Sequence, residues 1–243
     1  MRRAFMVRVK GIAAFVLFAG IAACSRGFLY RGSPAMEFSQ LDYTVPTQFS
    51  RGTPRLAYID AGSGTEPIVF IHGLATNAGY FRYNIPELAR THRVIAIDLP
   101  GYGKSEKKTS FPYTLSFYAS SVSTLLHELN IDRAVIAGHS MGGQIAMLLA
   151  LQEPALVSKL VLLDPAGIES FGPGEGEWLR NTLTIKGIKD VTEDGIRRNL
   201  SMNFLDWNNR WEWMVEERAR LARSAEFPQF ANAVVKSVGA MLD

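Results

Sequence analysis

The chain of 243 residues is long enough for one sizeable domain, and its hydrophobic content of 47% excludes a disordered protein. Its formal net charge of +3 depends on four basic residues near the N-terminus, Arg2, Arg3, Arg8 and Lys10, without which the charge is −1. Because the rest of the sequence shows no basic stripe with interleaved aromatic residues, we expect no nucleic-acid partner.

Residues 1–23 have the pattern of an export signal. Their basic start precedes the apolar run of residues 11–23, which is too short to span a bilayer comfortably and is typical of a signal peptide. Arg2-Arg3 followed by Phe5 also resembles a twin-arginine signal, so the sequence leaves open which of the two bacterial export routes is used.

The apolar run ends in Ile21-Ala22-Ala23-Cys24, which resembles the lipobox of bacterial lipoproteins. The resemblance implies that Cys24 is lipidated, becomes the mature N-terminus and attaches the protein to a membrane. Ser25 follows the cysteine, where lipoproteins of the inner membrane carry Asp, so we expect an outer-membrane anchor facing the periplasm. Cys24 is the only cysteine, so an intramolecular disulfide is excluded. An ordinary signal with a chance cysteine, or an uncleaved anchor, is the alternative.

Beyond the signal, we expect a tether at residues 24–40 and a core of alternating strands and helices at residues 41–167. Short apolar runs predict strands at 55–62, 67–73, 134–138 and 159–163, and at the start of 93–105. We expect helices at 79–90, 114–129 and 141–152. Strands that alternate with helices imply an α/β fold with a doubly wound, mostly parallel sheet.

From Gly167 onward the pattern changes to helix-like segments. All four tryptophans lie here, Trp178, Trp207, Trp211 and Trp213. Long insertions at the carboxyl ends of strands commonly build lids, so we predict a helical lid at 168–235, followed at 236–243 by the start of a C-terminal part. A helical layer that packs only for stability is the alternative.

Ser140 lies between a predicted strand and a predicted helix, in Gly138-His139-Ser140-Met141-Gly142. A serine nucleophile on such a turn needs small neighbours, because the backbone there is strained and crowded. The turn exposes the hydroxyl near the free N–H groups at the start of a helix, which favour negative charge. The N–H of Met141 is one candidate oxyanion donor. The N–H of Leu74, in His72-Gly73-Leu74 after an earlier strand, is the second.

Four stretches together resemble the α/β-hydrolase superfamily, and within it the lipase/esterase-like branch that carries a lid. They are HGLATN at 72–77, DLPGYGKS at 98–105, GHSMGG at 138–143 and KLVLLDPAG at 159–167. The resemblance implies that Ser140 is the nucleophile, that Leu74 and Met141 form the oxyanion hole, and that His72 and Gly73 shape the loop. Asp164 stands where some family members place their catalytic acid. Serine at position 140 argues against the dehalogenase and epoxide-hydrolase branches, which carry aspartate there.

The chain departs from the family pattern after the nucleophile. The family order is nucleophile, acid, histidine, but no histidine follows Ser140. The sequence therefore resembles a family member without its last two strand–helix units, which would leave the strand at 159–163 at a sheet edge. His72 lies on the correct rim of the sheet, but the resemblance gives it a structural role. The remaining histidines, expected at surface or packing positions, are His92, His127 and His139.

These patterns predict a serine hydrolase of the lipase/carboxylesterase type that acts on small or lipid esters with an apolar acyl group. The alternative is a catalytically inactive, truncated relative that binds an apolar ligand or a partner, because the catalytic histidine is missing. Neither interpretation implies a metal or an organic cofactor. The bond that is cleaved stays open, since thioesters, amides and carbon–carbon bonds are cleaved on the same scaffold.

Overall fold

A computed structural model describes residues 30, 32–169, 172 and 174–243. The predicted signal peptide, Cys24 and most of the predicted tether therefore lie outside the described residues. Within the described part, no helix has both the length and the apolar character that a membrane span requires.

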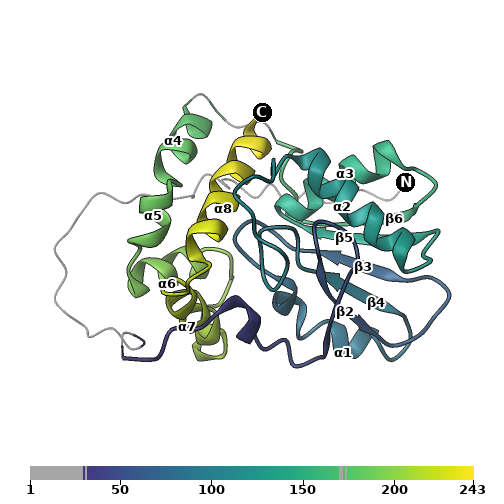
Figure 1. Cartoon of the computed structure of the whole chain (residues 1–243), viewed down its shortest axis with the longest axis horizontal. Coiled ribbons are helices and arrows are strands. Elements are labelled where there is room, and N and C mark those ends of the chain that lie inside the picture. The colour runs from purple at the N-terminus through teal and green to yellow at the C-terminus, as the bar shows by residue number, and fades with distance from the viewer. Residues whose placement is uncertain (1–29, 31, 170–171, 173) are drawn as a thin grey trace, which may run out of the picture. The chain divides into compact units, whose positions relative to one another are not determined.

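A six-stranded sheet is the centre of the fold, with the strand order β1-β2-β4-β3-β5-β6 (Figure 1). The strands are β1 (Thr47–Phe49), β2 (Ala57–Ala61), β3 (Ile68–Ile71), β4 (Val94–Ile97), β5 (Ala134–His139) and β6 (Val157–Leu163). Strands β3 to β6 run parallel, whereas β1 and β2 pair antiparallel. The predicted α/β fold with a mostly parallel, doubly wound sheet is therefore confirmed.

The helices that flank the sheet follow its strands along the chain. They are α1 (Ile85–Leu88), α2 (Leu115–Glu128) and α3 (Met141–Gln152). The continuous helix predicted at 79–90 is wrong, because a 3-10 helix (Ala78–Phe81) and the single turn α1 occupy this stretch. Pro86 lies in the first turn of α1, where its missing N–H is tolerated, but a helix that ran through it would lose a hydrogen bond.

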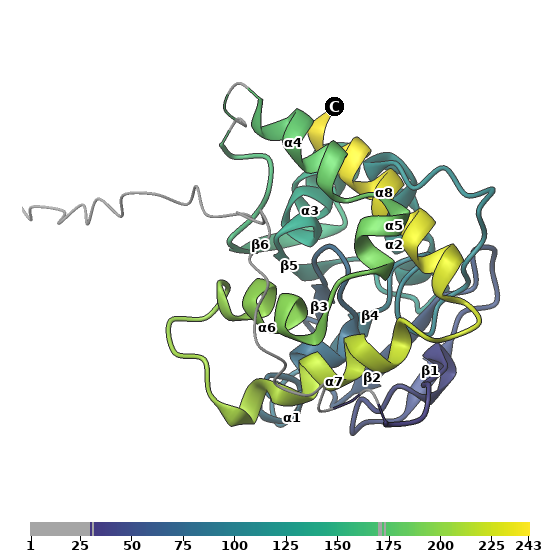
Figure 2. The same ribbon diagram turned by 90° about the vertical axis from the view of Figure 1, so that its left-hand side faces the viewer.

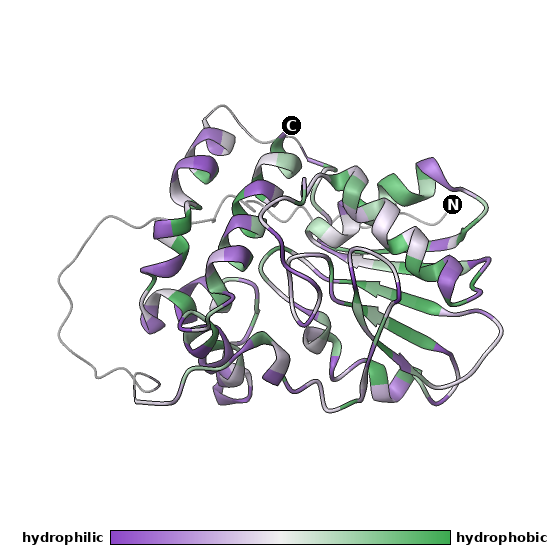
Figure 3. Cartoon of the chain, in the orientation of Figure 1, coloured by the Kyte–Doolittle hydropathy of each residue, from purple (hydrophilic) through white to green (hydrophobic). Residues whose placement is uncertain are grey.

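Strands β3, β4 and β5 are buried on both faces, which explains their continuous apolar sequences. One face packs Val69, Ile71, Ile95, Ile97 and Ile136 against α2 and α3. The other face packs Phe70, Val94, Ala96 and Ala137 against α1 and the preceding 3-10 helix. Figure 3 shows these strands as the most hydrophobic part of the sheet.

The chain divides into two compact units. The sheet unit comprises Ala35–Asp190 and Leu221–Asp243, and the helical unit comprises Val191–Arg220 with the described residues up to Pro34. Helices α4 (Glu175–Thr182), α5 (Ile185–Lys189) and α8 (Phe227–Leu242) belong to the sheet unit, where α4 and α5 pack beside α8 (Figure 2). The helical unit holds α6 (Glu193–Ser201), a 3-10 helix (Asn209–Trp211) and most of α7 (Glu212–Leu221). The predicted lid thus contributes helices to both units, and its predicted end at residue 235 falls inside α8.

Helix α8 is attached to the sheet unit through a buried serine. Ser237 Oγ donates to the carbonyl of Ala233 at 2.7 Å and accepts hydrogen bonds from the hydroxyls of Tyr102 at 2.8 Å and Tyr118 at 2.6 Å. Ser237 and both tyrosines are fully buried, and this burial raises the pKa of each phenol. The three hydroxyls therefore form a closed polar network in an otherwise apolar core.

The turn after β4 is organised by the buried carboxylate of Asp98. This carboxylate accepts hydrogen bonds from the hydroxyl of Tyr43 at 2.7 Å, from the N–H of Ala78 at 2.8 Å and from the N–H of Lys104 at 2.7 Å. Gly103 is required beside it, because a Cβ at this position would lie 2.1 Å from Asp98 Cγ. Asp98 thereby connects three segments that are distant in sequence.

Candidate active site

Ser140 occupies the turn between β5 and α3, and its backbone is strained. Its φ of 53° and ψ of −119° lie in a region that residues with side chains rarely adopt. The Ser140 N–H donates to the carbonyl of Leu163 at 3.0 Å, and the Ser140 carbonyl accepts from the N–H of Ala166 at 3.1 Å. The end of β6 and the turn that follows it therefore hold the strained serine in place.

Three glycines allow this turn to pack closely against its surroundings. A Cβ on Gly138 would lie 2.3 Å from the carbonyl oxygen of Gly142, and one on Gly142 would lie 2.2 Å from that of Ile71. A Cβ on Gly143 would lie 2.6 Å from Pro165 Cβ. Any side chain at these positions would push α3 away from the ends of β3 and β6.

The loop after β3 runs alongside Ser140. A Cβ on Gly73 would lie 3.1 Å from Ser140 Cβ and 3.0 Å from His139 Nδ1, so the backbone of the loop lies close to the serine. Leu74 follows Gly73, and Met141 follows Ser140. Among the described residues, the N–H groups of Leu74 and Met141 donate no hydrogen bond. The structure thus brings Ser140 together with both predicted oxyanion donors.

His72 is fully buried beneath this loop, and both of its ring nitrogens are engaged. Nε2 accepts from the N–H of Leu99 at 3.1 Å, so Nδ1 carries the proton and donates to the carbonyl of Gly73 at 2.8 Å. The hydroxyl of Thr76 donates to the same carbonyl at 2.8 Å. Burial, with a smaller effect of the nearby His139, lowers the pKa of His72 to about 4. His72 therefore holds the loop in a neutral form and has no free nitrogen for proton transfer.

His139 and Asp164 lie on either side of the serine turn. The His139 ring is half-buried beside Gly73, and burial lowers its pKa, while the negative charge of Asp164 acts in the opposite direction. Asp164 is exposed and has a positive φ of 42°. Within residues 32–169, no hydrogen bond or ion pair connects the Asp164 carboxylate to Ser140 or to a histidine.

The other two histidines are remote from Ser140. His92 precedes β4, at the amino ends of the parallel strands, whereas Ser140 follows the carboxyl end of β5. His127 is exposed on α2, where its Nε2 lies 3.3 Å from a carboxylate oxygen of Glu153. In the part of the chain that the structure describes, the Ser140 hydroxyl therefore has no histidine as hydrogen-bond partner.

Comparison with known proteins shows which proteins this chain resembles. Residues 66–183 match the family model of the alpha/beta hydrolase fold. An uncharacterized hydrolase of Bacillus subtilis is 45% identical over 104 residues, which are 43% of this chain and 38% of that protein. The 2-hydroxymuconate semialdehyde hydrolase of a Pseudomonas strain is 38% identical over 120 residues, which are 48% of this chain and 42% of that enzyme.

The solved structures agree with this assignment. A probable hydrolytic enzyme from Pseudomonas aeruginosa superposes with a TM-score of 0.75 and 27% identity, over 86% of this chain and 71% of that chain. The chain has the α/β-hydrolase fold. It nevertheless spans less than half the length of the two curated relatives named above.

Two further features of the fold bear on the candidate site. A hollow of about 510 Å³ is lined by Tyr43, Thr47, Arg55 and Lys104 among others, and Ser140 is not among its lining residues. No group of three potential metal-binding side chains occurs among the described His, Cys, Asp and Glu residues.

The sequence analysis missed the residues that support the Ser140 turn from outside it. Leu163, Pro165 and Ala166 hold Ser140 and Gly143, and the Asp164-Pro165 turn directly after β6 was a usable signal for them. The N–H of Leu99 as partner of His72 had no such signal, because the two residues come from different strands and their contact depends on the sheet order.

Proposed function

We propose that Ser140 is the nucleophile of an acyl hydrolase of the lipase/carboxylesterase type, with esters of apolar acyl groups as substrates. The observation that carries this proposal is the strained turn at Ser140, together with two unengaged N–H groups beside it. Backbone strain costs free energy and is found mainly at active sites, where it positions a reactive side chain.

The proposed reaction follows from the positions of these groups. The Ser140 hydroxyl attacks the ester carbonyl, and the developing oxyanion accepts hydrogen bonds from the N–H groups of Leu74 and Met141. The alcohol leaves, and water releases the acid from the acyl-enzyme. These backbone N–H groups need no rearrangement during the reaction, because the turn at Ser140 and the loop at Gly73 already hold them in place.

Proton transfer from Ser140 is the step that the described residues do not support. His72 is neutral, buried and doubly hydrogen-bonded, and His92 and His127 are remote. His139 lies beside the turn but makes no hydrogen bond to the Ser140 hydroxyl in the described structure. A serine hydroxyl without an adjacent base is a weak nucleophile. This observation favours a second candidate function, an inactive hydrolase fold that binds an apolar ligand or partner.

Fluorophosphonate labelling with and without added imidazole distinguishes the two functions. Imidazole can act as a diffusible base in place of a missing histidine side chain, so it should accelerate labelling of the wild-type chain while Ser140→Ala stays unlabelled. If both chains are labelled equally, Ser140 is not the nucleophile. If neither chain is labelled with or without imidazole, the non-catalytic function holds.

The cleaved bond is tested on the same two chains. We expect Ser140-dependent hydrolysis of short p-nitrophenyl esters in the presence of imidazole. The relative from Pseudomonas is named for a 2-hydroxymuconate semialdehyde substrate, so that compound is the second substrate to assay. Turnover of this compound with none of the esters would replace the ester assignment.

We further propose that the protein is exported and lipid-anchored at Cys24, and that it faces the periplasm from the outer membrane. The sequence Ile21-Ala22-Ala23-Cys24 and the following Ser25 support this proposal. Its partners would be an ester substrate and the membrane itself.

A further inference from the structure

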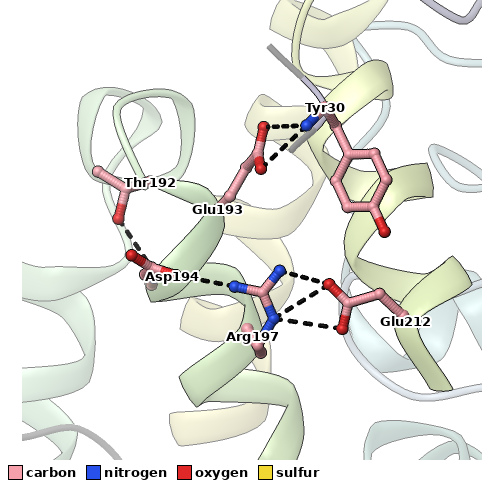
Figure 4. A network of polar contacts seen from close by, with 7 residues as sticks. Tyr30, Thr192, Glu193, Asp194, Arg197 and Glu212 are labelled. Carbon is pink, nitrogen blue, oxygen red and sulfur yellow. Dashed lines mark hydrogen bonds and ion pairs between the residues drawn. The ribbon is translucent and has the colours of Figure 1, made fainter. Parts of the chain in front are cut away.

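The described N-terminal residues are attached to the helical unit. The N–H of Tyr30 donates to both carboxylate oxygens of Glu193, at 3.0 and 3.1 Å (Figure 4). Arg220 Nε donates to the carbonyl of Pro34 at 3.1 Å. Glu193 is only 7% exposed, so this contact is part of the packed unit. The described residues Tyr30 and Pro34 are therefore held against α6 and α7, respectively.

Charged side chains connect the helices of this unit to one another. Arg197 on α6 pairs with Glu212 at the start of α7 and, at 2.8 Å, with Asp194 (Figure 4). Burial and the negative charges of Glu212 and Glu216 raise the pKa of Tyr30 above its usual value of 10.0. The Tyr30 ring thus lies among the charged side chains that connect α6 to α7. Tyr30 and Pro34 therefore belong to the helical unit.

The segment between α6 and α7 exposes apolar side chains. We call it the aromatic loop, and we define it by Met202, Phe204, Leu205, Trp207 and Trp211. Leu205 is 108% exposed and Met202 is 46% exposed. The Phe204 ring packs against Trp207 at 5.3 Å and against Trp211 at 4.8 Å between centroids, and these three rings are half-buried. Two exposed apolar side chains on the same short segment as a cluster of packed, half-buried aromatic rings make this segment a candidate interaction surface.

The charges of the helical unit are nearly balanced. Residues 191–220 hold five arginines and six acidic residues, and several of these are paired with each other. We therefore do not expect electrostatic attraction between this unit and a negatively charged surface. Its distinctive property is the combination of Trp, Phe, Met and Leu, which is typical of segments at the boundary between water and lipid.

We propose that the aromatic loop inserts into the surface of the lipid bilayer to which Cys24 is attached. Five residues lie between Cys24 and Tyr30, and the six extended steps from one to the other span at most about 22 Å. A lipid on Cys24 therefore keeps the helical unit within that distance of the bilayer. The inference depends on the proposed anchor, but not on catalysis by Ser140.

Tryptophan quenching by brominated phosphatidylcholine tests the proposal on the full chain isolated from membranes. Trp178→Phe removes the one tryptophan outside the helical unit, so the remaining emission comes from residues 207, 211 and 213. We expect strong quenching in brominated vesicles, reduced about tenfold by Leu205→Asp, which places a charge at the inserted position.

Leu151→Asp is the matched control, because Leu151 is also a strongly exposed leucine, at 81%, but lies on α3 in the sheet unit. Quenching should be unchanged in this variant, and circular dichroism should show that both variants are folded. Equal quenching of Leu205→Asp and its parent, or no quenching at all, would overturn the proposal. So would quenching that requires anionic lipid and disappears in high salt, or a shift from dimer to monomer in Leu205→Asp without a change in quenching.

Mass spectrometry of the same sample identifies the N-terminus and separates the two possible failures. If Cys24 is lipidated and quenching is absent, the loop proposal is wrong while the anchor proposal stands. If Cys24 is unmodified, quenching by added vesicles decides whether the aromatic loop binds lipid without the anchor. Hydrolysis assays are unaffected by either outcome, so a failure of the Ser140 proposal is detected independently.

Discussion

The backbone of Ser140 stores strain that can be measured. A φ of 53° costs a residue with a side chain about 1–3 kcal/mol, whereas glycine adopts this angle freely. We therefore predict that Ser140→Gly raises the free energy of unfolding by about 0.5–1 kcal/mol, while Ser140→Ala, which keeps its Cβ, does not. Urea denaturation of the three chains measures this difference. Equal stability of the glycine and alanine variants would contradict the argument.

The burial of His72 predicts a loss of stability in acid. Its pKa is about 4 in the folded protein and near 6.5 when exposed, so the unfolded chain binds the proton more readily below pH 6.5. The free energy of unfolding should therefore be unaffected by His72 above pH 6.5. It should fall by about 3 kcal/mol as the pH drops to 4.

This contribution is isolated by comparing slopes rather than absolute stabilities. His72→Gln should flatten the dependence of unfolding free energy on pH between 6.5 and 4. Thr124→Ala, at an exposed site on α2 without a titratable side chain, should leave that slope as it is in the wild type. An unchanged slope in His72→Gln would show that the folded protein accepts a proton on His72 without cost.

At the scale of single residues, the sequence predicted which backbone segments would meet better than it predicted the side-chain contacts. The spacing of glycines around Ser140 and after β3 was sufficient to predict which backbone groups would meet. The hydrogen bond from Leu99 to His72, and the position of the His139 ring beside Gly73, depend on tertiary packing and could not be read from spacing.

At the scale of elements, the attachment of α8 depends on the hydroxyl of Ser237. Replacing it with alanine leaves the buried hydroxyls of Tyr102 and Tyr118 without their acceptor. We predict that Ser237→Ala lowers the free energy of unfolding by about 1–3 kcal/mol. Thermal and urea denaturation measure it, with Ser120→Ala, an exposed serine on α2, as the control.

A double-mutant cycle checks the cause of this loss. In a Tyr118→Phe background one of the two orphaned hydroxyls is already absent, so Ser237→Ala should cost less than in the wild type. An equal cost in both backgrounds would indicate that the serine contributes through packing rather than through the hydroxyl network.

The elements that the sequence predicted well are those with the most continuous apolar patterns. Strands β3 and β5 and helix α3 were placed to within about two residues, because burial on both faces leaves a clear signal. Strand β1 has only three residues and an exposed pattern, so nothing in the sequence indicated it. The antiparallel direction of β2 was not foreseen either, because direction depends on the pairing partner.

At the scale of the whole molecule, the proposed lipid anchor on Cys24 would decide where the protein resides. If Cys24 carries lipid, the wild-type protein should fractionate with the outer membrane, and Cys24→Ser should release it or leave it unprocessed. Ser25→Asp should redirect the lipidated protein to the inner membrane. Membrane fractionation and mass spectrometry measure both results, and an unmodified N-terminus at or after residue 24 would contradict the prediction.

The hydrogen bonds of Ser140 to the end of β6 affect how fast the Ser140 amide exchanges its proton with solvent. Among the described strands β6 is bonded to β5 alone, and its Leu160, Val161 and Leu163 are 39 to 42% exposed. A strand bonded on one side opens more often than the interior of a sheet, and each opening breaks the bond between the Ser140 amide and Leu163. The amide of Ser140 should therefore exchange its proton with solvent at the rate of β6, far faster than the amides of β3. The time for which Ser140 keeps its strained conformation is thus determined by the opening of β6, and not by the core beneath the turn.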